Sequence, residues 1–106
     1  MIEAKTILLQ TEIAEARNVI CYFMRIVYEN GVEIGRAKNP HVVNFTPDSN
    51  PAALFAETNN DITTRNDMLW PAISSDEWAR ATAHCAVEHT PAVKAAYQAW
   101  KARASR

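Results

Sequence analysis

Hydrophobic and polar positions partly alternate over the first stretch of the chain. Between residues 5 and 16, one set of alternate positions is mainly apolar and holds Ile7, Leu9, Thr11 and Ile13. A period of two is typical of a β-strand with one buried face. Arg17 and Asn18 then form a short polar break. The pattern predicts a first strand that ends before residue 17.

Residues 19–29 are denser in β-branched and aromatic side chains, which favour a pleated surface. Both faces of this second predicted strand are apolar. Alternate side chains place Ile20, Tyr22, Met24, Ile26 and Tyr28 on one face and Cys21, Phe23 and Val27 on the other. A strand of this kind needs cover on both sides.

Asn30 and Gly31 follow directly and favour a type I′ hairpin turn, because both tolerate positive φ angles. The third predicted strand starts at Val32, is interrupted between Gly35 and Pro40, and resumes over residues 41–45. We therefore predict a three-strand antiparallel meander over residues 3–46, with the second strand in the centre.

Helix signals follow in the second half of the chain. Asn50 before Pro51 indicates a helix start, and Ser74 with Glu77 three residues later matches a capping box. A third start signal precedes an apolar stripe that holds Val93, Ala96, Tyr97 and Trp100. We expect two to three helices over residues 50–104, packed on one face of the sheet, and hence a single α+β domain over residues 1–106.

Charge and composition narrow the choice of partners. The chain has 11 Lys and Arg against 12 Asp and Glu, so no basic excess attracts a phosphate backbone or an acidic bilayer. The longest apolar run, residues 19–24, is far shorter than the roughly 20 residues that cross a bilayer. We predict neither nucleic acid nor membrane as a partner.

One segment concentrates ligand-type side chains: His84, Cys85, Glu88 and His89. On a helix, residues four apart share a face, and such pairs can bind zinc. The alternative is that Cys85 continues an inner apolar stripe while His84 and Glu88 form an exposed pair. We favour the second interpretation, and we predict no metal, no cofactor and no catalytic residue.

A three-strand sheet has one face that the helices leave uncovered. We expect another subunit to cover it, and we assign the interface to Tyr22, Met24, Ile26 and Tyr28 together with Trp70, which lies beside a proline in a loop. The sequence thus favours a homo-oligomer.

Three segments resemble small proteins encoded among the virion and tail genes of tailed bacteriophages. They are Glu29-Asn30-Gly31-Val32-Glu33-Ile34-Gly35-Arg36, Thr46-Pro47-Asp48 and Glu88-His89-Thr90-Pro91-Ala92-Val93-Lys94-Ala95-Ala96-Tyr97. The resemblance implies a structural or assembly role, with other virion or tail proteins as partners and the virion, or alternatively the host cytoplasm, as the location.

Two hypotheses for function follow. The first is a non-enzymatic, tail-associated structural or adaptor protein of a phage particle that assembles through sheet edges and an apolar sheet face. The second is a small metal-binding protein or enzyme that uses the cluster at residues 84–89.

Overall fold

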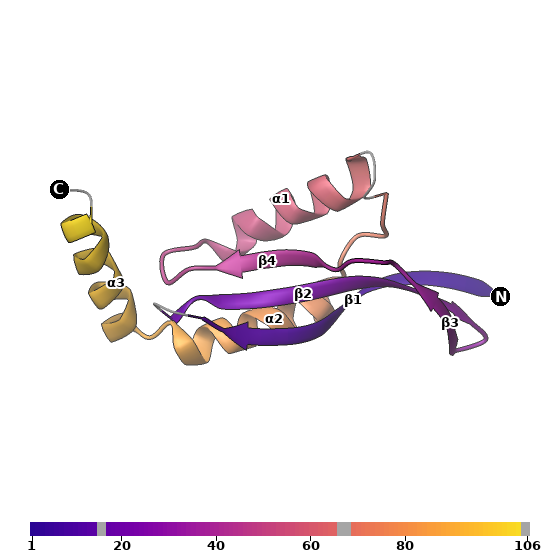
Figure 1. Cartoon of the computed structure of the whole chain (residues 1–106), viewed down its shortest axis with the longest axis horizontal. Coiled ribbons are helices and arrows are strands. Elements are labelled where there is room, and N and C mark those ends of the chain that lie inside the picture. Colours follow the sequence, from indigo (N-terminus) through magenta and orange to yellow (C-terminus); the bar gives the residue numbers. More distant parts are fainter. Residues whose placement is uncertain (15–16, 66–68, 105–106) are drawn as a thin grey trace.

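The computed structural model of the chain describes residues 1–14, 17–65 and 69–104, and these residues form an α+β fold, as predicted (Figure 1). The elements in order are β1 (Ile2–Ile13), β2 (Val19–Glu29), β3 (Val32–Arg36), β4 (His41–Phe45), α1 (Pro51–Thr64), α2 (Ser75–Glu88) and α3 (Pro91–Ala104). Ala16, the last residue of the predicted first strand, lies outside the described residues.

β2 is the centre of an antiparallel sheet. It pairs with β1 along its whole length, with β4 through residues 19–23 and with β3 through residues 26–29. The predicted third strand is therefore two strands, and the described sheet has four strands rather than three. The chain leaves the ladder after Arg36, and Pro40, which has no N–H to donate, lies in the interruption before β4.

The predicted hairpin joins β2 to β3. Asn30 and Gly31 have φ angles of 51° and 84°, which a type I′ turn requires. This β2–β3 hairpin and the first residues of β1 form an arm that extends past the helices (Figure 1). We call this part of the sheet the arm.

The core lies on one face of the sheet. Its strand members are Leu8, Val19, Cys21, Phe23, Val43 and Phe45, and its helical members are Ile62 from α1 and Trp78, Ala81 and Cys85 from α2. Because both helices contribute to the same cluster, they cover the same face. We call this the inner face, and the opposite side the outer face.

Trp78 is the centre of that core. Its ring lies 5.8 Å from Phe23, 5.2 Å from Phe45 and 5.1 Å from Phe55, measured between centroids. Its indole N–H donates to the carbonyl of Pro51 at 3.1 Å. One side chain of α2 thus joins β2, β4 and α1.

All three predicted helix starts are confirmed, and the third lies at Thr90, whose Oγ1 accepts from the N–H of Val93. The Asn50 side chain accepts hydrogen bonds from the N–H groups of Ala52 and Ala53, and Ser74 Oγ accepts from the N–H of Glu77 at 3.2 Å. The carboxylate of Glu77 has a different partner from the one that a capping box implies. It reaches across to β1, where its Oε2 accepts from the N–H of Leu8 at 3.0 Å.

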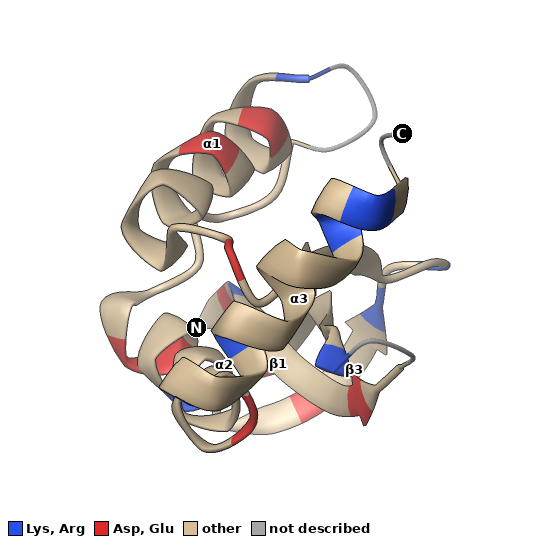
Figure 2. Cartoon of the chain, turned by 90° about the vertical axis from the view of Figure 1, so that its left-hand side faces the viewer, with Lys and Arg blue, Asp and Glu red and all other residues tan. Residues whose placement is uncertain are grey.

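α3 differs from the other two helices, because none of its described residues is buried. It lies at one end of the molecule and faces the viewer in Figure 2, where its charged residues are all Lys or Arg. The predicted apolar stripe is present, but it does not join the core, and Trp100 is 51% exposed. Lys101 links the helix to the body through an ion pair with Asp48 at 2.5 Å. No described helix has the length and apolarity needed to cross a bilayer.

We expect Trp78→Ala to lower the free energy of unfolding by about 3–5 kcal/mol, because it removes the shared partner of three phenylalanine rings. Trp78→Phe should cost less, since a ring remains while the bond to Pro51 is lost. Trp100→Ala is the control and should cost less than about 1 kcal/mol. Urea denaturation measures all three, and equal losses at positions 78 and 100 would contradict this account of the core.

Candidate functional site

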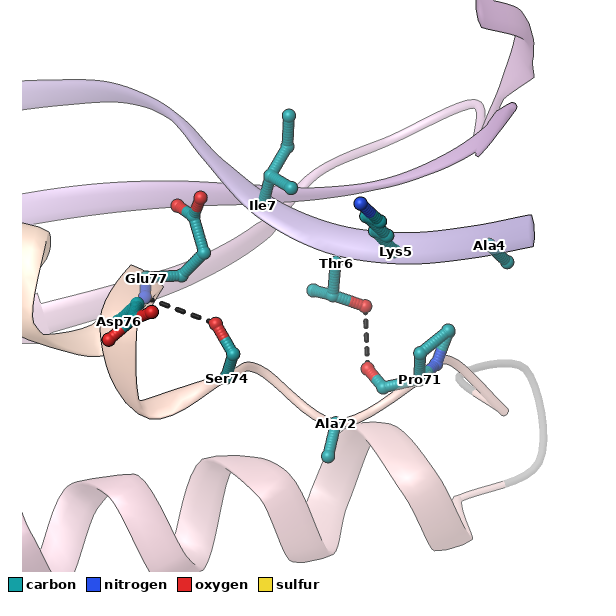
Figure 3. Close-up of a pocket in the computed structure, with 9 residues that line it drawn as sticks. All are labelled: Ala4, Lys5, Thr6, Ile7, Pro71, Ala72, Ser74, Asp76 and Glu77. Carbon is teal, nitrogen blue, oxygen red and sulfur yellow. Dashed lines mark hydrogen bonds between the residues drawn. The ribbon is translucent and has the colours of Figure 1, made fainter. Parts of the chain in front are cut away.

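A groove of about 390 Å³ runs beside β1 in the described structure (Figure 3). One wall is the strand itself, and the other is the segment that leads into α2 and forms its first turn. The groove is lined by Ala4, Lys5, Thr6, Ile7, Pro71, Ala72, Ser74, Asp76 and Glu77. The two walls come from segments far apart in the chain.

Two hydrogen bonds hold the walls together. Thr6 Oγ1 donates to the carbonyl of Pro71 at 2.6 Å, and the N–H of Leu8 donates to Glu77 Oε2. Arg80 donates in turn to both oxygens of Glu77, at 3.1 Å and 3.0 Å, and so fixes the position of that carboxylate. The groove is therefore supported at two points along β1.

The groove is lined by charged and hydroxyl side chains and by the backbone of β1. Its lining has one cation, Lys5, and two carboxylates, Asp76 and Glu77, but no histidine or cysteine. Both hydroxyls of the lining have structural partners: Thr6 Oγ1 donates to the carbonyl of Pro71, and Ser74 Oγ accepts from the N–H of Glu77. What the groove does offer is the backbone of β1, whose side away from β2 pairs with no other strand in the described sheet.

The outer face carries four of the five predicted interface residues. Met24 and Ile26 are only 6% and 1% exposed, although neither belongs to the core under the helices. The partners of Ile26 across the sheet are Lys5 and Arg36, whose long aliphatic stems can lie along an apolar neighbour. The sheet's own side chains thus form a second, thinner apolar layer.

Tyr22 and Tyr28 are half-buried on the same face. The hydroxyl of Tyr22 donates to Glu12 at 2.7 Å, and this hydrogen bond raises the pKa of Tyr22 above its usual value. Lys5 lies over the ring of Tyr28, 5.9 Å from its centroid. Val42, the partner of Tyr22 on β4, is 50% exposed and is the most open apolar side chain at the centre of this face.

Trp70 does not join this set. It packs against the core cluster on the helix side, and its backbone N–H donates to the carbonyl of Ile62 at 2.7 Å. The structure therefore brings four of the predicted interface residues onto one face and places the fifth on the other.

The segment with histidine, cysteine and glutamate side chains is also dispersed. His84 is exposed on α2, and Cys85 lies in the core. Glu88 forms an ion pair with Arg17 at 3.2 Å, and His89 Nε2 lies 2.7 Å from the carbonyl oxygen of Arg17. Within the part of the chain that the structure describes, no three metal-ligating side chains come close enough together to hold an ion.

Arg17 is instead the residue that ties this segment to the sheet. It precedes β2 with a positive φ angle of 63°, a conformation uncommon for a side chain other than glycine. Its side chain and its carbonyl contact Glu88 and His89, which end α2. These contacts give Glu88 and His89 a structural role.

No pattern in the sequence indicates the groove. Glu77 is identified there only as a capping residue, and Thr6 only falls within the range of the first predicted strand. The contact between Leu8 and Glu77 joins residues 69 apart in the chain, and no local pattern links such positions. Only the packing of α2 against β1 brings them together.

We compared the chain with protein-family models, with curated proteins and with solved structures, and none of the three comparisons gave a match.

The bond between Leu8 and Glu77 leads to a stability prediction. We expect Glu77→Ala to lower the free energy of unfolding by about 1–2 kcal/mol, because the N–H of Leu8 loses its acceptor. Glu77→Gln should lose less, since its amide oxygen still accepts. Asp76→Ala, which removes a neighbouring acid that is exposed, should cost about 0.5 kcal/mol or less. Urea denaturation gives the three values, and equal losses for Glu77→Ala and Asp76→Ala would count against the role of this bond.

Burial raises the pKa of the Cys85 thiol to about 11, and the nearby Cys21 adds to the effect. At pH 8 its thiolate fraction should therefore be about a hundredth of that of an ordinary thiol. We expect alkylation by iodoacetamide in the folded state to be correspondingly slow and to become fast in denaturant. Mass spectrometry of the labelled peptides measures both rates, and rapid labelling of Cys85 in the folded protein would show that the segment opens.

Proposed function

We propose that this protein is a non-enzymatic structural or adaptor subunit that assembles through its sheet. The observation that carries the proposal is the outer face. Apolar side chains lie on it, and the two helices of the core, α1 and α2, cover the opposite face. Val42 is half-exposed there beside the half-buried Ile20 and Tyr22. Exposed apolar surface of this kind is typical of a protein interface.

The arm adds further apolar surface. Ile2 and Val32 lie on either side of Glu29 in one row across the three strands, and both are exposed, as is Ile34 next to them on β3. An arm that extends beyond the helices gains little from packing within its own chain. A partner that covers it would bury these side chains and stabilise its position.

The groove beside β1 also supports the proposal. Its open strand edge offers backbone hydrogen bonds to a partner. The metal-binding alternative lacks a comparable feature, since the described residues 84–89 engage the core and Arg17 rather than one another.

The resemblance to tailed-phage virion and tail proteins supplies the setting. On this proposal the partners are other virion or tail proteins and further copies of the chain, and the protein is located in the particle. Mass spectrometry of purified particles separates a structural component from an assembly factor, because an assembly factor would be missing from the finished particle.

The outer face can be tested by a single charge. We expect the wild-type protein to associate as its concentration rises, and Val42→Glu to weaken association by about tenfold or more, because it places an unpaired charge in the interface. Light scattering coupled to size exclusion gives the mass at each concentration.

Asn60→Glu is the matched control, because it adds the same charge to an exposed position of α1. Its association should equal that of the wild type. A strict monomer at every concentration that also binds no particle protein would overturn the proposed function.

A further inference from the structure

We propose that the edge of β1 between Ile2 and Thr6 pairs with the same edge of a second copy of this chain, in antiparallel fashion, about a two-fold axis at Ala4. The inference rests on the proposed assembly role and names one of its interfaces. It follows from four features of β1: the direction of its backbone groups, its charges, the groove beside it and the point where the open edge ends.

The direction of the backbone groups follows from the pairing with β2. The N–H of Leu8 donates to Glu77 and so points away from β2, whereas the carbonyl of Met1 accepts from Asn30 on the β2 side. Successive residues of a strand point in opposite directions. The N–H and C=O groups of Ala4 and Thr6 therefore face outward from the sheet. Thr6 is only 3% exposed and is bonded to the wall at Pro71, so Ala4 offers the accessible pair of groups to a further strand.

The charges on this edge are complementary to themselves. Glu3 and Lys5 lie on either side of Ala4, and both project from the outer face. When two copies pair antiparallel about Ala4, Glu3 of each copy stands opposite Lys5 of the other. Opposite charges in directly facing positions stabilise a strand pair, and like charges destabilise it. Only a register centred on Ala4 forms both pairs.

The groove accommodates the side chains of the inner face. In this register Ile2 of one copy stands opposite Thr6 of the other, beside the wall that Pro71 and Ala72 form (Figure 3). Ile2 is 67% exposed in the isolated chain, so the pairing would bury it. Ala4 lies at the axis itself, where its small side chain lets the strands approach.

The length of the pairing is limited. Beyond Thr6 the next outward N–H, that of Leu8, already has Glu77 as its acceptor. The register of β1 with β2 also shifts between Leu8 and Gln10, which bends the strand. A strand pair of limited length about a two-fold axis gives a closed dimer rather than an open fibre.

Charge reversal tests this arrangement. E3K places two lysine–lysine pairs across the axis, and K5E places two glutamate–glutamate pairs there. Each variant alone should therefore dimerise about tenfold more weakly than the wild type. An equimolar mixture of the two should recover dimers, because the E3K chain carries a lysine at both positions and the K5E chain carries a glutamate at both. Every facing pair in the mixed dimer then joins opposite charges. Sedimentation of each variant and of the mixture measures the dissociation constants.

The recovery in the mixture is the decisive result. Glu3 and Lys5 also form an ion pair within one chain, at 3.8 Å, and mixing cannot restore that pair. E57K and K38E make the same charge changes at exposed positions away from β1 and should dimerise as the wild type does. Amide exchange supplies a second readout, in which the N–H group of Ala4 becomes protected as the concentration rises.

The possible failures are distinct. If the wild type associates but E3K, K5E and their mixture all behave as it does, the β1 pairing is wrong while the proposed assembly role stands. If the wild type neither associates nor binds a particle protein, both fail. A loss in each single variant without recovery in the mixture also overturns the pairing.

Discussion

The packing of the Trp78 indole against three phenylalanine rings is the contact on which the rest of the fold depends. The rings belong to β2, β4 and α1, so one side chain of α2 fixes the relative positions of four elements. The hydrogen bond from its indole N–H to the carbonyl of Pro51 also places the first turn of α1 against α2. A single aromatic cluster of this kind lets a small chain hold two helices on a sheet.

The same cluster divides the sheet into two parts. The aromatic core contacts β2 at Phe23, in the half of the strand that pairs with β4. The half that pairs with β3 extends beyond the helices as the arm, and none of its described residues belongs to the core cluster, although Ile26 is buried there. The part of the molecule least stabilised by its own core is thus the part that offers the most surface to a partner.

The sequence predicted the features that depend on local chemistry. The turn at Asn30 and Gly31 and the helix starts at Asn50 and Ser74 follow from residues that neighbour one another in the chain, and the structure confirms all three. The number of strands was wrong because the interruption before Pro40 could be a bulge or a break. The burial of Ile26 on a face without helices was also missed, because it depends on neighbours across the sheet rather than on the strand's own pattern.

Glu77 shows why the candidate site could not be predicted in the same way. In the sequence it belongs to the start of α2, and in the structure its carboxylate also accepts the outward N–H of Leu8 and is held there by Arg80. That bond closes the edge of β1 at residue 8 and leaves the edge before it open. Leu8 and Glu77 come together only when α2, which begins at Ser75, packs on the sheet. The packing of this helix therefore decides which part of β1 is available to a partner.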